Sequence, residues 1–217
     1  MNMSKKVGIL GTGMVGQVLA SGFLKHGHQV MIATRDAGKV SDWLEKNPGG
    51  EVGTHKEVAK WADIIVLATK GTAAEAAIRL CDSADLADKT VIDATNPIAD
   101  APPTNGVLHF FTTLEESLME QLQKVSAKAH FVKAFNSVGN AFMVNPDFGG
   151  VKPTMFICGN DANAKKEVTA MLDQFGWESE DMGGVEGARA IEPLCILWCI
   201  PGFARNQWNH AFKLLKK

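Results

Sequence analysis

Three glycines near the start of the chain have the spacing of a turn that binds nucleotide phosphates. Gly11, Gly13 and Gly16 form a G-x-G-x-x-G pattern between an apolar segment and a helical one. In this pattern the first glycine permits a tight turn, the second lets the backbone approach a pyrophosphate, and the third lets the helix pack close to the strand. The free N–H groups and positive dipole end of that helix favour an anion. The spacing therefore predicts a dinucleotide site.

The residues after the second predicted strand indicate which dinucleotide binds. In NAD sites an acidic residue about 20 positions after the glycine turn usually holds the adenosine ribose. Here Thr34 stands at that place, Arg35 follows it, and Lys39 comes one helical turn later. A hydroxyl and a guanidinium suit a 2′-phosphate, so the sequence predicts NADP(H) rather than NAD(H). The alternative is that Arg35 is a solvated surface residue and that Asp36 holds the ribose.

Alternating strands and helices are expected to position these residues. Residues 5–10 are predicted to form a strand, 14–26 a helix and 28–33 a second parallel strand, which together make a βαβ unit. The alternation continues with strands at 51–53, 63–68, 90–94 and 129–135, and with helices at 36–47, 55–60, 73–81 and 114–125. This order predicts an α/β fold that is Rossmann-like and doubly wound, with a mainly parallel sheet.

The last third of the chain is predicted to add a small, largely helical portion. We expect an NADP-binding Rossmann domain over residues 1–150 and a strand/helix portion over 151–217, packed on it as one compact unit. The predicted elements are strands at 154–158 and 177–182 and a helix at 162–175. A largely apolar helix over 186–199 is predicted to kink at Pro193 and to end at Pro201 and Gly202. Residues 204–215 have an amphipathic pattern.

Polar residues follow several predicted strands at the edge where ligands gather in open parallel sheets. Thr69 and Lys70 follow the strand at 63–68, Asn96 follows the next strand, and Asn136 follows the strand at 129–135. We expect these residues near the nicotinamide half of the cofactor. The alternative is that the Asn and Thr side chains satisfy local backbone groups, as they commonly do in turns.

Composition excludes several classes of partner. The 217 residues carry a net charge of −2, which gives no electrostatic reason to expect nucleic acid. No apolar run reaches the roughly 20 residues that span a bilayer, and the short segment before the first strand leaves no room for a signal peptide. A cytoplasmic protein is therefore expected. The four cysteines, including Cys195 and Cys199 four positions apart, are interpreted as buried thiols, and no metal site is predicted.

Missing residue types limit the chemistry. The chain contains no tyrosine, which excludes the Tyr–Lys proton-donor pair of short-chain dehydrogenases. No His–Asp or Lys–Asn pair presents itself as a general acid, so no catalytic residue is assigned. What remains is hydride exchange with an acceptor that needs little proton help, such as a flavin-like ring. In that reaction the protein mainly stacks two rings at reactive distance and excludes water.

Five blocks spread over nearly the whole chain carry a resemblance to a known family: residues 11–16, 33–35, 132–136, 156–161 and 183–194. They resemble the NADP oxidoreductases that use a deazaflavin coenzyme, and the related N-terminal reductase domain of the STEAP-type metalloreductases. The resemblance implies a Rossmann-like domain, an NADP(H) site, a flavin-like or deazaflavin acceptor as second substrate, and a homodimer.

The resemblance also implies roles for individual residues. It places the acceptor, a small molecule, near the Asn96 loop, the Asn136 segment and the late helix from Gly184. It places 2′-phosphate recognition on Thr34 and Arg35. The phosphate loop falls on five consecutive residues: Gly11, Thr12, Gly13, Met14 and Val15.

Two other functions stay open at this point. One is a binding module that senses NADP(H) without catalysis, which the missing catalytic pair would favour. The other is an imine or ketone reductase that acts as a dimer, with the apolar helix at 191–199 as the dimer core.

Overall fold

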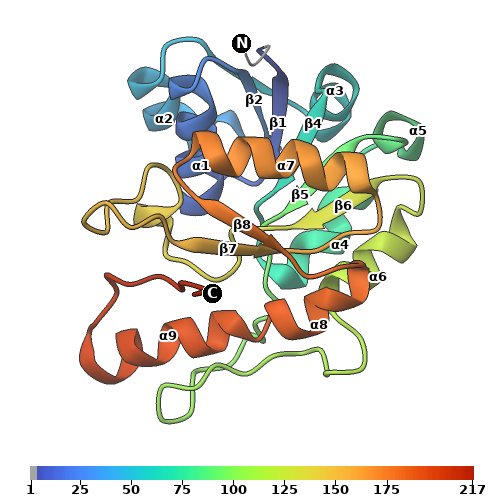
Figure 1. Ribbon diagram of the computed structural model, residues 1–217. Coiled ribbons are helices and arrows are strands. Elements are labelled where there is room, and N and C mark those ends of the chain that lie inside the picture. Colours follow the sequence, from blue (N-terminus) through green and yellow to red (C-terminus); the bar gives the residue numbers. More distant parts are fainter. Residues whose placement is uncertain (1–3) are drawn as a thin grey trace.

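A six-stranded parallel sheet forms the centre of the protein, whose computed structural model describes residues 4–217 (Figure 1). Its strand order is β3-β2-β1-β4-β5-β6, and every neighbouring pair is parallel. The order reverses beside β1, which is the topology of a doubly wound sheet with a ligand crevice at the carboxyl ends of its strands. The predicted fold class is confirmed. The strands are β1 (Lys6–Leu10), β2 (Gln29–Ala33), β3 (Gly50–Gly53), β4 (Ile64–Leu67), β5 (Thr90–Asp93) and β6 (His130–Lys133).

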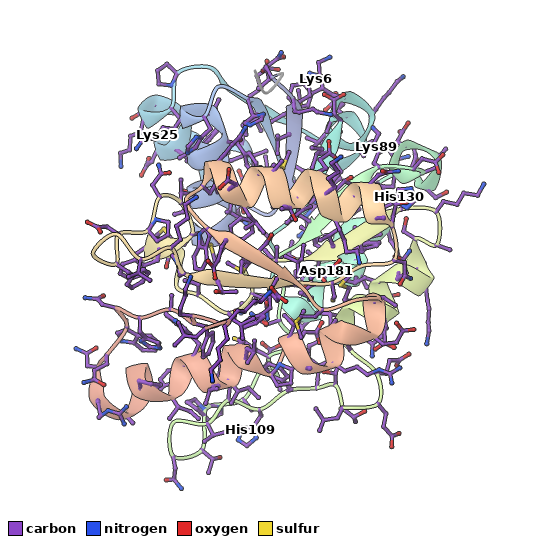
Figure 2. All side chains as sticks on the ribbon, viewed as in Figure 1. Lys6, Lys25, Lys89, His109, His130 and Asp181 are labelled. Carbon is purple, nitrogen blue, oxygen red and sulfur yellow. The ribbon has the colours of Figure 1, made fainter. Side chains whose placement is uncertain are left out.

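Helices cover both faces of this sheet, so its central strands are buried on both sides. In β4, Ile64 and Val66 pack into one hydrophobic core while Ile65 and Leu67 pack into the other. This explains the continuous apolar run of the strand. Side chains fill the space between sheet and helices (Figure 2). One face is covered by α1 (Met14–Lys25), α2 (Ser41–Lys46) and α7 (Ala162–Gln174), and the other by α3 (His55–Trp61), α4 (Gly71–Arg79) and α6 (Leu118–Val125).

Side-chain caps set where two of these helices begin. The Thr54 hydroxyl accepts the Glu57 N–H, and the Glu57 carboxylate accepts the Thr54 N–H, so α3 begins where the sequence predicts. Ser117 and Glu120 form the same reciprocal box, and α6 therefore begins at Leu118 rather than at residue 114. The predicted helix over 36–47 is divided into a 3₁₀ turn, η1 (Ala37–Val40), and α2, and a short helix α5 (Ser83–Leu86) lies before β5.

The C-terminal part forms a second, two-stranded parallel sheet of β7 (Thr154–Ile157) and β8 (Glu178–Asp181), connected by α7. The Lys133 N–H donates to the Cys158 carbonyl at 3.0 Å, which joins the end of β6 to this small sheet. Phe175 and Trp177 are buried in the same core as α1 and β1. The remaining elements are the 3₁₀ turns η2 (Asn140–Phe142) and η3 (Val185–Gly187) and the helices α8 (Ala188–Ile191) and α9 (Leu194–Arg205).

The predicted end of the apolar helix at Pro201 and Gly202 is wrong. The break near Pro193 is present, between α8 and α9, but α9 continues through Pro201 to Arg205 and ends at Asn206, whose φ is +53°. Pro201 deprives the Leu197 carbonyl of a partner, and Leu197 is exposed, so water can replace that hydrogen bond. Gly202 is needed because the Trp208 ring lies against its Cα, where a Cβ would come within 2.2 Å.

The amphipathic segment after α9 is an irregular tail that runs beside β7. The Thr154 N–H donates to the Phe212 carbonyl at 2.8 Å, and the Leu214 N–H donates to the Thr154 hydroxyl at 3.0 Å. Among residues 4–217, neither α9 nor any other helix has the length and apolar character needed to cross a membrane.

Candidate dinucleotide-binding site

The three glycines of the first turn have the three steric roles that their spacing predicts. Gly11 has a φ of +140°, and a Cβ there would lie 2.3 Å from the Ala68 carbonyl oxygen. A Cβ on Gly16 would lie 2.2 Å from the Gly11 carbonyl oxygen, so this glycine permits the close packing of α1. Around the Cβ position of Gly13, no heavy atom of residues 4–217 outside its own chain neighbours lies within 4 Å. Gly13 therefore faces open space.

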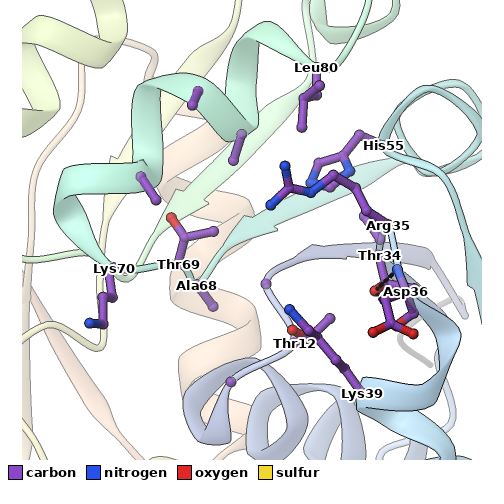
Figure 3. A pocket seen from close by; sticks show the side chains of 16 residues that line it. Thr12, Thr34, Arg35, Asp36, Lys39, His55, Ala68, Thr69, Lys70 and Leu80 are labelled. Carbon is purple, nitrogen blue, oxygen red and sulfur yellow. Dashed lines mark hydrogen bonds between the residues drawn. The ribbon is translucent and has the colours of Figure 1, made fainter.

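That open space is a cleft of about 490 Å³ at the carboxyl ends of β1, β2 and β4 (Figure 3). Seven residues predicted from the sequence line it: Gly11, Thr12, Gly13, Thr34, Arg35, Thr69 and Lys70. The cleft is also lined by Ala33, Asp36, Lys39, His55 and Ala68, by Ala73, Ala76 and Ala77 of α4, and by Leu80, which directly follows α4. Within residues 4–217, no group of three His, Cys, Asp or Glu side chains could hold a metal ion.

The segment that follows β2 contributes two exposed cations to the cleft, Arg35 in the turn and Lys39 in η1. The Thr34 hydroxyl donates to the Asp36 carbonyl at 2.7 Å and accepts the Asp36 N–H at 3.0 Å. Asp36 in turn uses its Oδ1 to accept the Gly38 N–H at 3.0 Å, which caps η1. Thr34 and Asp36 therefore hold the turn, while Arg35 and Lys39 supply the positive charge.

His55 lies at the start of α3 beside the Arg35 guanidinium (Figure 3). Burial lowers the pKa of His55, and the Arg35 charge lowers it further, so the imidazole is neutral at neutral pH. Opposite this pair, α4 presents an apolar wall. Its members recur at i, i+3, i+4 and i+7, a spacing in the sequence that places side chains on one face of a helix: Ala73, Ala76 and Ala77 of α4, and Leu80 directly after it.

The other four predicted residues do not line the cleft with their side chains. Met14 is 64% exposed, and Val15 is half-buried on α1. Asn96 donates from Nδ2 to the Asn136 carbonyl at 2.7 Å, and Asn136 donates from Nδ2 to the Ile191 carbonyl at 2.9 Å. Each of these asparagines thus donates to a backbone carbonyl that is distant in the sequence, and not to the local backbone groups of a turn. The buried Asn136 Oδ1 and Thr69 Oγ1 have no hydrogen-bond partner among the described residues.

Comparisons with known proteins agree with this fold. Residues 6–97 match the family described as NADP oxidoreductase, coenzyme F420-dependent. The crystal structure of a candidate F420-dependent NADP reductase from Arthrobacter sp. FB24 has a TM-score of 0.92 and 31% identity, covering 98% of this chain and 100% of that one. The F420-dependent NADP reductase of Methanothermobacter thermautotrophicus is 28% identical over 222 residues, which cover 94% of this chain and 93% of the relative.

Two further comparisons are partial. Metalloreductase STEAP3 of Rattus norvegicus is 29% identical over 202 residues, which cover 90% of this chain but 38% of that protein. A reductive aminase from Aspergillus terreus, solved with NADPH, has a TM-score of 0.67 and 18% identity, and the match covers 62% of its chain. That level of identity shows a shared fold alone.

A doubly wound sheet with a glycine turn after its first strand is the architecture of dinucleotide-binding oxidoreductases. The chain belongs to the family of F420-dependent NADP oxidoreductases.

Proposed function

We propose that this protein transfers a hydride between the nicotinamide of NADP(H) and a flavin-like or deazaflavin acceptor. The observation that carries the proposal is one cleft that joins the open space over Gly13 to the cations Arg35 and Lys39, in a chain of the F420-dependent family. The fit to NADP(H) is steric and electrostatic: the open space admits a pyrophosphate, and the two cations suit a 2′-phosphate.

The assignment of residues follows from their places along the cleft. Gly11, Thr12 and Gly13 hold the pyrophosphate. Glycine has no side chain to cap a helix, so the first-turn N–H groups of Met14 and Val15 are left for the phosphate, although their side chains lie elsewhere. Arg35 and Lys39 bind the 2′-phosphate and Thr34 shapes the turn that carries them. The adenine lies between the Arg35–His55 pair and the α4 wall.

The nicotinamide half extends toward the ends of β4, β5 and β6, where Thr69, Lys70, Asn96 and Asn136 lie. When bound, the cofactor supplies or accepts the hydride. The residues at this end orient the ring and exclude water, which are the main contributions that a ring-to-ring transfer asks of a protein. Of the titratable residues lining the cleft, Lys70 alone lies at this end, because Arg35, Asp36, Lys39 and His55 lie on the adenosine side.

A panel of acceptors tests this function. NADPH oxidation is measured with FMN, FAD, riboflavin, coenzyme F420 and quinones, with a cyclic imine as the substrate of the alternative reaction. Turnover is expected with at least one isoalloxazine or deazaflavin ring and not with the imine. Tight NADPH binding without turnover of any acceptor would instead support a sensing module, and turnover of the imine alone would support an imine reductase.

We also propose a homodimer that forms through α9. Gly106, in the long loop between β5 and α6 (residues 94–117), lies against Phe203 of α9, so this loop and the helix form one surface. Large apolar side chains are exposed on it: Val107, Phe111, Leu114, Leu197 and Phe203. The mass measured by light scattering is expected to be twice that of the chain, and a monomer at micromolar concentration would contradict the proposal.

A further inference from the structure

Beneath the ends of β5 and β6 lies a cluster of three charged side chains that is closed to water. Lys133, at the end of β6, is fully buried, and its Nζ is 2.7 Å from Asp93 Oδ2 and 2.9 Å from Glu192 Oε1. Burial by itself would lower the pKa of Lys133, but the charges of Asp93 and Glu192 outweigh it and raise the pKa above its usual value. The cluster therefore holds an ammonium between two carboxylates.

The cluster fixes three atoms of one residue, Thr95. Lys133 Nζ donates to the Thr95 carbonyl oxygen at 3.0 Å. Asp93 Oδ1 accepts the Thr95 N–H at 2.9 Å and the Thr95 hydroxyl at 2.6 Å. Because charge-assisted hydrogen bonds are short and directional, Thr95 has little freedom to shift or rotate.

The position of Thr95 affects the cleft because the residue after it packs closely against the start of α4. The carbonyl of the next residue, Asn96, lies so near Gly71 that a Cβ on Gly71 would come within 2.0 Å of its oxygen. Gly71 is the first residue of α4 and directly follows Thr69 and Lys70, which line the cleft. A movement of Thr95 would therefore displace the turn between β4 and α4.

Glu192 connects the same cluster to the C-terminal part. Its carboxylate accepts the N–H groups of Leu118 and Met119, each at 3.0 Å, and so caps the first turn of α6. Arg189, on α8, makes a bidentate contact with Glu120 of α6 close by. The C-terminal helices and the sheet are thus locked together at this end of the sheet.

We propose that Lys133, held by Asp93 and Glu192, is a positioning residue that sets the turns after β4 and β5 at the nicotinamide end of the cleft. Apolar side chains of similar volume can stabilise a fold as well as a buried ion pair does. Unlike apolar side chains, the charged cluster makes directional hydrogen bonds, and these hold the oxygen and nitrogen atoms of Thr95 in one arrangement. The link to nicotinamide placement rests on the proposed function.

The first arm of the test needs no cofactor. Lys133→Met keeps an unbranched side chain that is one atom shorter and removes the ammonium. In the free protein, two hydrogen-bonded amides report on the two turns: the Thr95 N–H, which donates to Asp93, and the Ala73 N–H, which donates to the Lys70 carbonyl. Both are expected to exchange at least about tenfold faster than in the wild type, since a tenfold change corresponds to the loss of a modest interaction. Unchanged exchange at both turns in a folded variant would overturn the inference.

The second arm follows the bound nicotinamide. NADPH affinity, measured by calorimetry, is expected to stay within about threefold of wild type, because the adenosine and pyrophosphate contacts lie at distant sites. The fluorescence enhancement of the bound dihydronicotinamide is expected to fall, and the hydride-transfer rate with the accepted ring to fall about tenfold or more, since small misplacements of reacting groups are costly. Normal fluorescence and normal rate would contradict the positioning role.

Two further variants keep the test decisive. Lys165→Met is the matched control: Lys165 is largely buried on α7 and pairs with Asp181 (labelled in Figure 2) at 2.8 Å, but belongs to another part of the fold. It is expected to leave exchange at the two turns, fluorescence and rate unchanged.

If Lys133→Met does not fold, Thr95→Val takes its place. This variant removes one contact to Asp93, keeps the charges and should show the same changes more weakly. A wild type that binds no NADPH would refute the proposed function alone, because the first arm stands without it.

Discussion

Gly13→Val is expected to weaken NADPH binding by about 100-fold or more while the protein stays folded. The backbone at Gly13 is extended, with φ −75° and ψ 177°, which suits valine. A Cβ there meets no protein atom among residues 4–217, so the added methyl groups project into the space assigned to the pyrophosphate. Calorimetry gives the affinity, and a thermal melt without cofactor is expected to shift by no more than about 4 °C.

Gly16→Ala is the matched control for this prediction. Its Cβ would lie 2.2 Å from the Gly11 carbonyl oxygen, inside the contact between α1 and β1. We expect this variant to lose roughly 1–3 kcal/mol of stability, because the close packing must open. One glycine change would thus affect binding and the other the fold. Wild-type NADPH affinity in a folded Gly13→Val protein would disprove the assigned place of the pyrophosphate.

Arg35→Ala is expected to weaken NADPH binding by about 10- to 100-fold and to leave NADH binding nearly unchanged, since a hydrogen bond to a charged group contributes about 1.5–3 kcal/mol. The two dinucleotides differ only in the 2′-phosphate, so the change in their affinity ratio isolates that group. Lys39 remains in the variant and should preserve part of the selectivity. Affinities for both cofactors are measured at one ionic strength, because salt screens exposed charges.

Arg79→Ala provides the comparison for Arg35. Arg79 is on α4, pairs with Glu75 at 2.7 Å, is exposed and does not line the cleft. Removing its charge should leave both affinities unchanged. If Arg35→Ala also leaves NADPH binding unchanged, Arg35 is a solvated surface residue, and 2′-phosphate recognition has to be sought at Lys39.

The sequence predicts the sheet and the glycine turn well because their signals are local. Gly11, Gly13 and Gly16 are close together, and their spacing within one βαβ unit is itself the signal, although Gly11 also lies against Ala68 at the end of β4. The continuous apolar runs of the strands likewise indicate that both faces of the sheet are buried, without any knowledge of which helices cover them. The strand order then follows from the general rules for alternating β and α elements. This explains why the fold class could be predicted without any structural information.

Features that depend on distant residues could not be predicted. Lys133 gives no hint in the sequence that it is buried, because its partners Asp93 and Glu192 come from other elements. Asn96 and Asn136 were correctly expected at neighbouring strand ends, yet only the structure shows that they bond to each other and to backbone groups. Pro201 was expected to end the helix, but α9 continues through it because the Leu197 carbonyl that loses its hydrogen bond is in an exposed turn.

The enclosed charge cluster has a consequence for the order in which the chain folds. An ammonium without its carboxylates is too costly to keep out of water, so Lys133 has to stay hydrated until both Asp93 and Glu192 arrive. We therefore expect the end of the sheet at β5 and β6 to close only after the segment that carries Glu192 has been synthesised. A sheet edge that waits for a distant segment is open to pairing with other chains, so this end of the sheet is where we expect aggregation of the nascent chain to begin.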